Sequence, residues 1–368
     1  MHLRRRQRLT TVGVAAVATA LSLAACSSSS TSAPSGGSTT SPAGGSTTSG
    51  AALNGTLTGS GSSFQLIFQQ TAIQNFKTVQ PNMTVNYGGG GSGKGRTDLS
   101  SGVTNFAGSD SPVPTAEESN FAGKTVLYFP VFLGPITVSY NLSGVSNLKL
   151  DATVLANIFQ GKITKWNDPA IAALNSGVSL PSSAITIAVR SDSSGTTQNF
   201  SLYLEKAAGS AWTLGSSSTI KWPATARAGM GNGGVAQIIK STPGAIGYVD
   251  YADAKAASLS FASIKNSSGN YIAPSPESAS AAGSAITVSA NLTFHAVDSP
   301  APQAYPITYQ SWVLVIQAQS NSNNAAMLKA YIGYLLGDGQ QLLTGLGYAP
   351  LPSNILTQAQ AQVSKIGT

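Results

Sequence analysis

The stretch ITIAVRSDSSGTTQNF, residues 185–200, contains the unit from which the rest of the architecture follows. Residues 185–190 are rich in β-branched side chains and predict a strand. Residues 191–196 are Ser, Asp, Gly and Thr, a composition that both ends a strand and supplies the caps at which a helix begins. A strand that leads through a short polar loop into a helix is typical of α/β proteins.

The same unit occurs twice more, nearer the start of the chain. The loops TGSGSSF (residues 58–64) and GGGGSGKG (residues 88–95) each follow a strand-like segment and precede a helix-like one. After the first loop, an apolar stripe with helical spacing predicts a helix; it consists of Phe64, Ile67, Phe68, Ala72 and Phe76. Three copies of one unit strengthen the prediction of an α/β fold.

Further signals extend this pattern along the chain. Helix starts are predicted at a capping box from Thr115 to Glu118, at Asp168 followed by Pro169, and at the beginning of residues 151–161. Strands are predicted over residues 83–87, 105–109, 125–132, 136–140, 185–190, 245–249 and 307–316. These strands are numerous enough for two sheets, and 368 residues are enough for two lobes.

The charge of the chain argues against a nucleic-acid partner. Only 9% of the residues are charged, compared with about a quarter in typical proteins. The formal net charge is +7, but four arginines belong to the extreme N-terminus and without them it is about +3. Whatever the protein recognises must therefore be held largely by backbone and hydroxyl groups.

Cysteine and histidine are almost absent. Cys26 is the only cysteine, which excludes intramolecular disulfides and multi-cysteine zinc sites. His2 and His295 are the only histidines, so catalysis built on imidazole is nearly excluded by count. We expect no metal, no cofactor and no catalytic residues.

The N-terminus is predicted to be a targeting segment. A basic stretch and an apolar run, too short to span a membrane, end in Leu23-Ala24-Ala25-Cys26, which resembles the lipobox of bacterial lipoproteins. We therefore expect residues 1–25 to be a lipoprotein signal peptide and Cys26 to carry the lipid. Residues 27–52 contain only Ser, Thr, Gly, Pro and Ala, which predicts a flexible tether outside the cytoplasmic membrane.

Each of the three polar loops is a candidate anion site. Free N–H groups and the dipole at a helix start favour negative charge, and small residues let an oxyanion approach the backbone. Ordinary helix capping by Ser and Thr is the alternative for any one loop.

Two charged groups lie beside these loops. Arg190 ends a predicted strand, and its planar fork can bind two oxygens of a phosphate or sulfate while Asp192 steadies it. Asp110 follows residues 105–109, and a carboxylate there can accept a hydrogen bond from the P–OH of hydrogen phosphate, which sulfate does not offer. The alternatives are a surface ion pair for Arg190 and a turn cap for Asp110.

The second loop also matches most of a nucleotide-binding motif. Gly88, Gly93 and Lys94 have the spacing of a Walker A loop, but Gly95 stands where the motif needs a magnesium-binding hydroxyl. An exported chain would also meet no ATP. We therefore do not expect an NTPase.

Together these residues resemble the phosphate-binding proteins of the bacterial high-affinity phosphate ABC transporter, within the periplasmic type II solute-binding proteins. The resemblance runs from about residue 57 to residue 352. The blocks that carry it are LTGSGSSF (57–64), the NY segment into Ser92 (86–92), FAGSD (106–110), GKITKW (161–166), RSDSSGT (190–196), PGAIGYV (243–249), PIT (306–308) and YAPLP (348–352).

The resemblance implies a two-lobed α/β fold with phosphate in the cleft between mixed sheets flanked by helices. It places residues 53–132 and 305–368 in lobe I and residues 133–304 in lobe II, with crossings near Phe132 and Tyr305. Closure by hinge rotation would bring the loops of both lobes onto the anion.

The resemblance also implies a set of phosphate ligands. The phosphate-binding residues would be Ser63, Phe64, Ser92, Asp110, Arg190, Ser194, Gly195 and Thr196, with Asp192 supporting Arg190. The usual Ser-Ser-Gly-Gly of the second loop is Ser92-Gly93-Lys94-Gly95 here, so a shift of one position would replace Ser92 and could bring Lys94 to the anion.

The implied function is capture of inorganic phosphate and its delivery to the permease subunits of an ABC importer, by a monomer without catalysis. The residues alone also allow three other functions: a receptor for another oxyanion such as sulfate, an exported phosphatase, and a surface protein that merely retains the fold.

Overall fold

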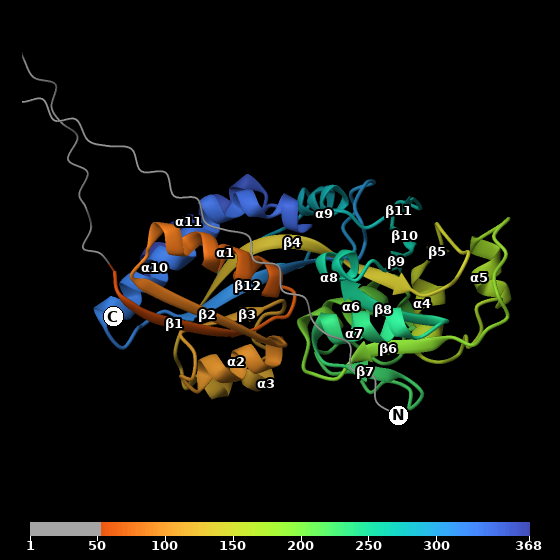
Figure 1. Cartoon of the computed structure of the whole chain (residues 1–368), viewed down its shortest axis with the longest axis horizontal. Coiled ribbons are helices and arrows are strands. Elements are labelled where there is room, and N and C mark those ends of the chain that lie inside the picture. The colour runs from red at the N-terminus through yellow and green to blue at the C-terminus, as the bar shows by residue number, and fades with distance from the viewer. Residues whose placement is uncertain (1–52) are drawn as a thin grey trace, which may run out of the picture. The chain divides into compact units, whose positions relative to one another are not determined.

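One long strand, β4 (Val126–Tyr140), runs through the middle of the fold and connects two groups of strands (Figure 1). The computed structural model describes residues 53–368; the predicted signal peptide, Cys26 and the tether lie outside the described residues. Every residue of β4 after Val126 is buried, which explains its nearly continuous apolar sequence. It pairs with β12 (Thr308–Ile316) as far as Pro135 and with β8 (Ala245–Asp250) from Ile136 onward.

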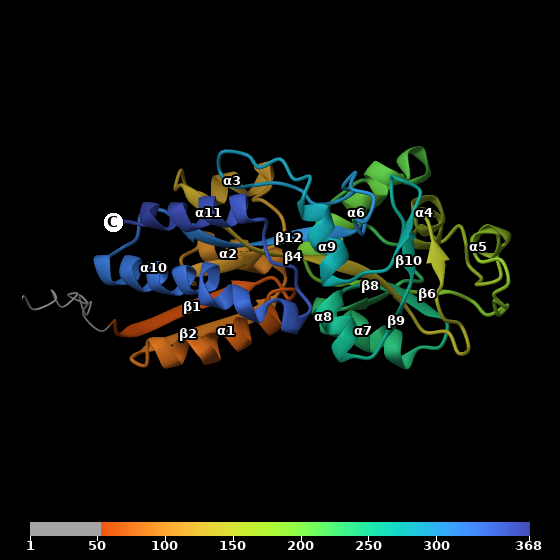
Figure 2. The same ribbon diagram turned by 90° about the horizontal axis from the view of Figure 1, so that it is seen from above.

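The first group of strands forms what we call the first lobe. Its strand order is β2 (Met83–Gly90), β1 (Gly55–Gly61), β3 (Phe106–Ser109), β12 and β4. β1 is parallel to β2 and β3, whereas β12 is antiparallel to β3 and β4. Its helices are α1 (Leu66–Val79), α2 (Ser92–Ser100), α3 (Thr115–Glu118), α10 (Ser322–Leu336) and α11 (Ser353–Gln362) (Figure 2).

The second group of strands forms the second lobe. Its strand order is β4, β8, β6 (Thr186–Arg190) and β7 (Arg227–Gly229), with β9 (Ser260–Phe261) also paired with β4. A small separate sheet contains β5 (Lys149–Leu150), β10 (Ser263–Lys265) and β11 (Tyr271–Ile272). The helices are α4 (Ala152–Phe159), α5 (Pro169–Leu174), α6 (Gly195–Ala207), α7 (Gly231–Ser241), α8 (Tyr251–Ala256) and α9 (Pro276–Gly283).

Short 3₁₀ helices complete the described elements: Ser119–Phe121, Gly209–Ala211, Asp338–Leu342, Thr344–Leu346 and Val363–Lys365. Within residues 53–368, no helix is both long and apolar enough to cross a membrane.

The predicted α/β fold with two lobes, mixed sheets and flanking helices is confirmed. The predicted helix starts at Asp151 and Asp168 are also confirmed, because each carboxylate accepts a hydrogen bond from a first-turn N–H, that of Val154 or Ala170, at 2.9 Å. All three strand–loop–helix units are present, as β1–α1, β2–α2 and β6–α6.

Four predictions about local structure are wrong. The capping box at Thr115 does not form, because Pro114 takes the N-cap position and Thr115 is already helical. Residues 58–61 and 88–90 belong to β1 and β2, so the first two loops are shorter than predicted. The two strands predicted on either side of residues 133–135 are a single strand, β4.

Pro135 lies where β4 changes its pairing partner from β12 to β8. Its missing N–H therefore interrupts neither ladder of hydrogen bonds.

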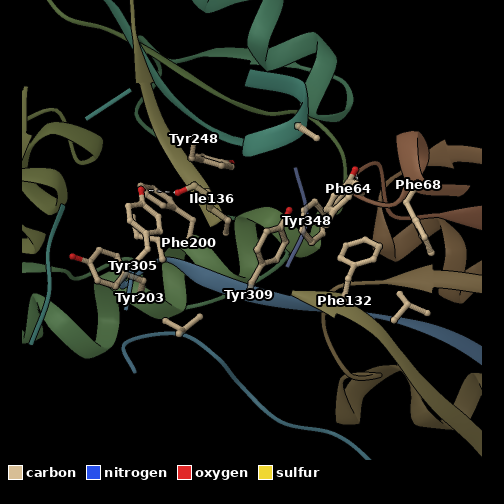
Figure 3. Packing of buried hydrophobic residues seen from close by; sticks show 14 of the residues in the cluster. Phe64, Phe68, Phe132, Ile136, Phe200, Tyr203, Tyr248, Tyr305, Tyr309 and Tyr348 are labelled. Carbon is tan, nitrogen blue, oxygen red and sulfur yellow. Dashed lines mark hydrogen bonds between the residues drawn. The ribbon is translucent and has the colours of Figure 1, made fainter. Parts of the chain in front are cut away.

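One buried cluster contains aromatic rings from both lobes (Figure 3). The Phe64 ring stacks on Tyr309 of β12, with centroids 4.0 Å apart, and meets Phe132 of β4 edge-on at 4.9 Å. In the second lobe, Phe200 of α6 stacks on Tyr248 of β8 at 4.6 Å. These rings fix the backbone directly beside the first and third loops, since Phe64 ends the first and Phe200 follows the third.

Candidate functional site

The buried carboxylate of Asp110 is surrounded by serine hydroxyls. Asp110 directly follows β3 and is only 2% exposed. Ser62 Oγ lies 2.7 and 2.8 Å from its two carboxylate oxygens, and Ser92 Oγ lies 3.3 Å from Oδ2. Ser311 of β12 also donates to Oδ1. Three separate segments of the first lobe therefore hold this one carboxylate.

Burial changes the acidity of this carboxyl group. Removal from water raises the pKa of Asp110 to about 6, although hydrogen bonds from Ser311 and Ser62 and the charge of Arg190 each act to lower it. At neutral pH the group is mainly an ionised hydrogen-bond acceptor, close to the pH at which it takes up a proton.

Arg190 ends β6 in the second lobe and is 5% exposed. Its Nε donates to Asp192 Oδ1 at 2.8 Å, and its Nη2 donates to Asp192 Oδ2. Its Nη1 lies 3.0 Å from Asn232 Oδ1 and 3.3 Å from Thr196 Oγ1. Burial alone would raise the pKa of Asp192, but the hydrogen bonds and charge of Arg190 hold that pKa below its ordinary value. The guanidinium is thus fixed in orientation.

The start of α6 contacts the Asp110 cluster directly. Ser194 is the N-cap of this helix, and its Oγ accepts the Thr197 N–H at 3.1 Å. The first N–H groups of a helix have no partner within it, and here they belong to Gly195 and Thr196. A Cβ added at Gly195 would lie 2.5 Å from Ser92 Oγ and 2.8 Å from Asp110 Oδ2. Only glycine lets the two lobes approach so closely here.

Hydrogen bonds close the two lobes around these groups. The Gly93 N–H donates to the Ser193 carbonyl oxygen at 3.0 Å, and Asn199 Nδ2 donates to the Asp110 carbonyl oxygen at 2.7 Å. Asn199 is also held within α6 by the Gly195 carbonyl oxygen at 2.9 Å. The arrangement therefore pairs one cation and several N–H and O–H donors with one acidic acceptor, which suits an anion that carries a proton.

The first loop adds two further groups. Ser63 is 8% exposed, and its Oγ accepts the Asn232 N–H from the second lobe at 3.2 Å. The Phe64 N–H points to Ser62 Oγ at 3.1 Å, within the cluster around Asp110. Within residues 53–368, no group of three or more His, Cys, Asp or Glu side chains could hold a metal ion.

Comparison with known proteins places the chain in a family. A family model described as a PBP superfamily domain matches residues 41–338. Phosphate-binding protein PstS 3 of Mycobacterium tuberculosis is 35% identical over 321 residues, which cover 84% of this chain and 86% of that protein. This chain belongs to the phosphate-binding protein family. The predicted resemblance is confirmed.

Other members of the phosphate-binding protein family agree in sequence and in fold. Phosphate-binding protein PstS of Pasteurella multocida is 36% identical over 318 residues, covering 83% of this chain and 89% of that protein. A solved high-affinity periplasmic phosphate-binding protein with bound phosphate aligns with a TM-score of 0.68 at 22% identity, covering 84% of this chain and 94% of that chain. The phosphate-binding protein of Stenotrophomonas maltophilia aligns with a TM-score of 0.67 at 18% identity, with the same coverage.

In this phosphate-binding protein family member, residues of the three loops lie close to Asp110, which follows β3, and to Arg190, which ends β6. Lys94 is not among them: its Nζ pairs with Asp98 one turn along α2, and half of the Lys94 side chain is exposed. Ser92, by contrast, contacts Asp110 directly, because the Asp110 N–H donates to Ser92 Oγ at 3.1 Å.

The sequence did not predict Ser62, Asn199, Ser311 and Asn232, which contact Asp110 or Arg190. Ser62 lies inside the first loop beside Ser63, and the loop composition could have indicated it. Ser311 is a hydroxyl within the wholly buried middle of β12, which is a weak signal. Asn232 is the second residue of α7, after Gly231, and nothing in its local sequence indicates a ligand.

Proposed function

We propose that this chain is an extracytoplasmic receptor that binds inorganic phosphate between its two lobes and delivers it to the permease of an ABC importer. The observation that carries this proposal is the placement of Asp110 against Gly195 at the start of α6, with Arg190 fixed by Asp192 in the same lobe as that helix. The names of the curated relatives support phosphate as the ligand.

In this proposal both lobes supply ligands. Arg190 neutralises the anion, and Asp110 accepts the proton of hydrogen phosphate. The remaining donors are the hydroxyls of Ser63, Ser92, Ser194 and Thr196 and the main-chain N–H groups of Phe64, Gly195 and Thr196. Each of these groups is buried, so its hydrogen bonds to an anion would form away from water, where they are stronger.

The same site would discriminate between oxyanions. Sulfate is fully ionised near neutral pH and offers no donor to Asp110, so it would meet an ionised, buried carboxylate at close range. Hydrogen phosphate would instead form a hydrogen bond there. We therefore propose phosphate rather than another tetrahedral oxyanion.

Capture and release require the lobes to move. We propose that residues 53–132 with 305–368 and residues 133–304 are the two moving bodies, linked by β4 and by the chain near Tyr305. The contacts between Gly93 and Ser193 and between Ser63 and Asn232 would break when the cleft opens.

We further propose that residues 1–25 are removed, that Cys26 is lipidated and that residues 27–52 tether the receptor to the outer face of the cytoplasmic membrane. The tether would let a monomeric binding body reach the permease. The body would perform no catalysis.

Calorimetric titration of the anion-free protein tests this function. Phosphate should bind with micromolar or tighter affinity, and sulfate at the same ionic strength should give no heat of binding. Equal binding of both anions would favour a general oxyanion receptor. Turnover of a chromogenic phosphate ester would favour the phosphatase alternative, and silence toward both anions would refute the proposal.

A further inference from the structure

Asn232 is a fully buried residue that contacts both lobes. It is the second residue of α7 and is 0% exposed. Its main-chain N–H donates to Ser63 Oγ of the first lobe at 3.2 Å. Its side-chain Oδ1 accepts from Arg190 Nη1 at 3.0 Å. One residue thus links the fixed guanidinium to the first loop.

The side-chain amide nitrogen of Asn232 has no hydrogen-bond partner among the described residues. The orientation of the carboxamide is settled by Arg190, because a flipped amide would point its NH₂ group at a cation. Two N–H donors are therefore buried without an acceptor, a state that native proteins avoid. The nearby carboxylate of Asp192 already accepts from Arg190 and from the Gly231 N–H at 3.0 Å.

We propose that Asn232 is a further phosphate ligand, whose Nδ2 donates to an oxygen of the bound phosphate. This inference rests on the proposed function. It explains why a buried donor lies beside Arg190 and Ser63 with no acceptor in the described part of the protein. An amide suits this position because its oxygen faces the guanidinium while its nitrogen presents a donor without adding charge.

The position of Asn232 also couples binding to closure. The hydrogen bond from its backbone to Ser63 exists only when the lobes meet at this point. A phosphate bound by Nδ2 would hold the start of α7 in the place that this contact requires. Asn232 therefore favours the closed form when phosphate is present.

Two variants of the full-length protein test the inference by phosphate titration. Asn232→Asp keeps an oxygen for Arg190 but replaces the donor with an acceptor of nearly the same shape. Asn232→Ala removes both groups. We expect phosphate affinity to fall about 10- to 100-fold in Asn232→Ala, as for loss of one hydrogen bond to a charged group, and further in Asn232→Asp.

Asn175 provides a matched control. It is also a buried asparagine, but its Nδ2 donates to the Lys149 and Ile171 carbonyl oxygens at 2.8 and 2.9 Å. Asn175→Asp should lower the melting temperature of the ligand-free protein and leave phosphate affinity unchanged. The Asn232 variants should show the reverse pattern.

The outcomes separate this inference from the proposed function. If the unmodified protein binds phosphate and Asn232→Asp binds it equally well or better, Asn232 only holds Arg190 and the inference is wrong. A large loss of affinity in both Asn232 variants with intact ligand-free stability supports it. Failure of the unmodified protein to bind phosphate would instead refute the proposed function itself, and this inference with it.

Discussion

Replacing Asp110 with Asn should remove a loss of stability that the protein suffers as the pH rises through about 6, and should weaken its preference for phosphate. The folded-state pKa of Asp110 is raised from 3.8 to about 6 because burial disfavours the charged carboxylate. A group with a raised pKa stabilises the fold when it is protonated. The stability that protonated Asp110 contributes is therefore fully present below pH 3.8 and is lost as the pH rises through about 6. The ionised carboxylate therefore opposes folding above pH 6, whereas the neutral amide of the Asp110→Asn variant does not.

The size of this effect follows from the raised pKa. A rise from 3.8 to about 6 corresponds to about 3 kcal/mol, and Asp110 is buried enough that solvent screening reduces it little. Part of the penalty is already present at pH 4, where an unfolded carboxyl group is about half ionised. With the lobes in contact as in this structure, the free energy of unfolding of Asp110→Asn relative to the unmodified protein should therefore increase by about 2–3 kcal/mol between pH 4 and pH 7.5; opening of the cleft without phosphate would expose Asp110 and make the increase smaller.

Urea unfolding of both phosphate-free proteins at these two pH values measures that increase. Asp98 supplies a control of opposite sign, because the hydrogen bonds and charge of Lys94 hold its pKa below the ordinary value despite partial burial. Asp98→Asn should lose stability at neutral pH and recover it in acid. If the difference in unfolding free energy between Asp110→Asn and the unmodified protein stays constant with pH, this prediction is refuted, because the pKa of Asp110 would then not be raised by folding. In the binding assay, the ratio of phosphate to sulfate affinity should fall in Asp110→Asn. An unchanged ratio would show that Asp110 does not recognise the proton of hydrogen phosphate.

Three further changes test other parts of the site and fold. Arg190→Lys keeps the charge but loses the planar fork, so calorimetry should show phosphate affinity reduced about 100-fold or more; near-normal affinity would mean that charge alone suffices. Gly195→Ala places a Cβ 2.5 Å from Ser92 Oγ, so we expect weaker phosphate binding and no compaction on adding phosphate in small-angle scattering, with normal ligand-free stability. Glu117→Gln removes the ion-pair partner of the buried Arg96 and should lower the free energy of unfolding by about 2 kcal/mol, less than for a fully buried pair because the Glu117 side chain is 30% exposed. A change below about 0.5 kcal/mol in urea unfolding would contradict that expectation.

The parts of the fold that could be predicted are those written in local sequence. The units β1–α1, β2–α2 and β6–α6 each combine a run of strand formers, small polar residues and a helical segment along one short stretch of chain. Capping by Asp151 and Asp168 is equally local. The capping box predicted at Thr115 does not form, because Pro114 takes the N-cap position with an extended backbone and provides no side-chain acceptor.

The parts that could not be predicted depend on contacts between distant segments. Ser311 reaches Asp110 because β12 pairs with β3, which aligns Trp312 with Ser109. Asn232 reaches Arg190 because α7 packs against the end of β6, and it meets Ser63 because the lobes close. The sequence alone does not decide whether Lys94 reaches the anion; Lys94 pairs with Asp98 because one turn of α2 brings these two side chains together.

Titration of the anion-free protein with phosphate, and then with sulfate at the same ionic strength, decides whether this chain is a phosphate receptor. We predict micromolar or tighter binding of phosphate and no measurable binding of sulfate at pH 7.5. Equal affinity for the two anions, or no binding of phosphate, would contradict the proposed function.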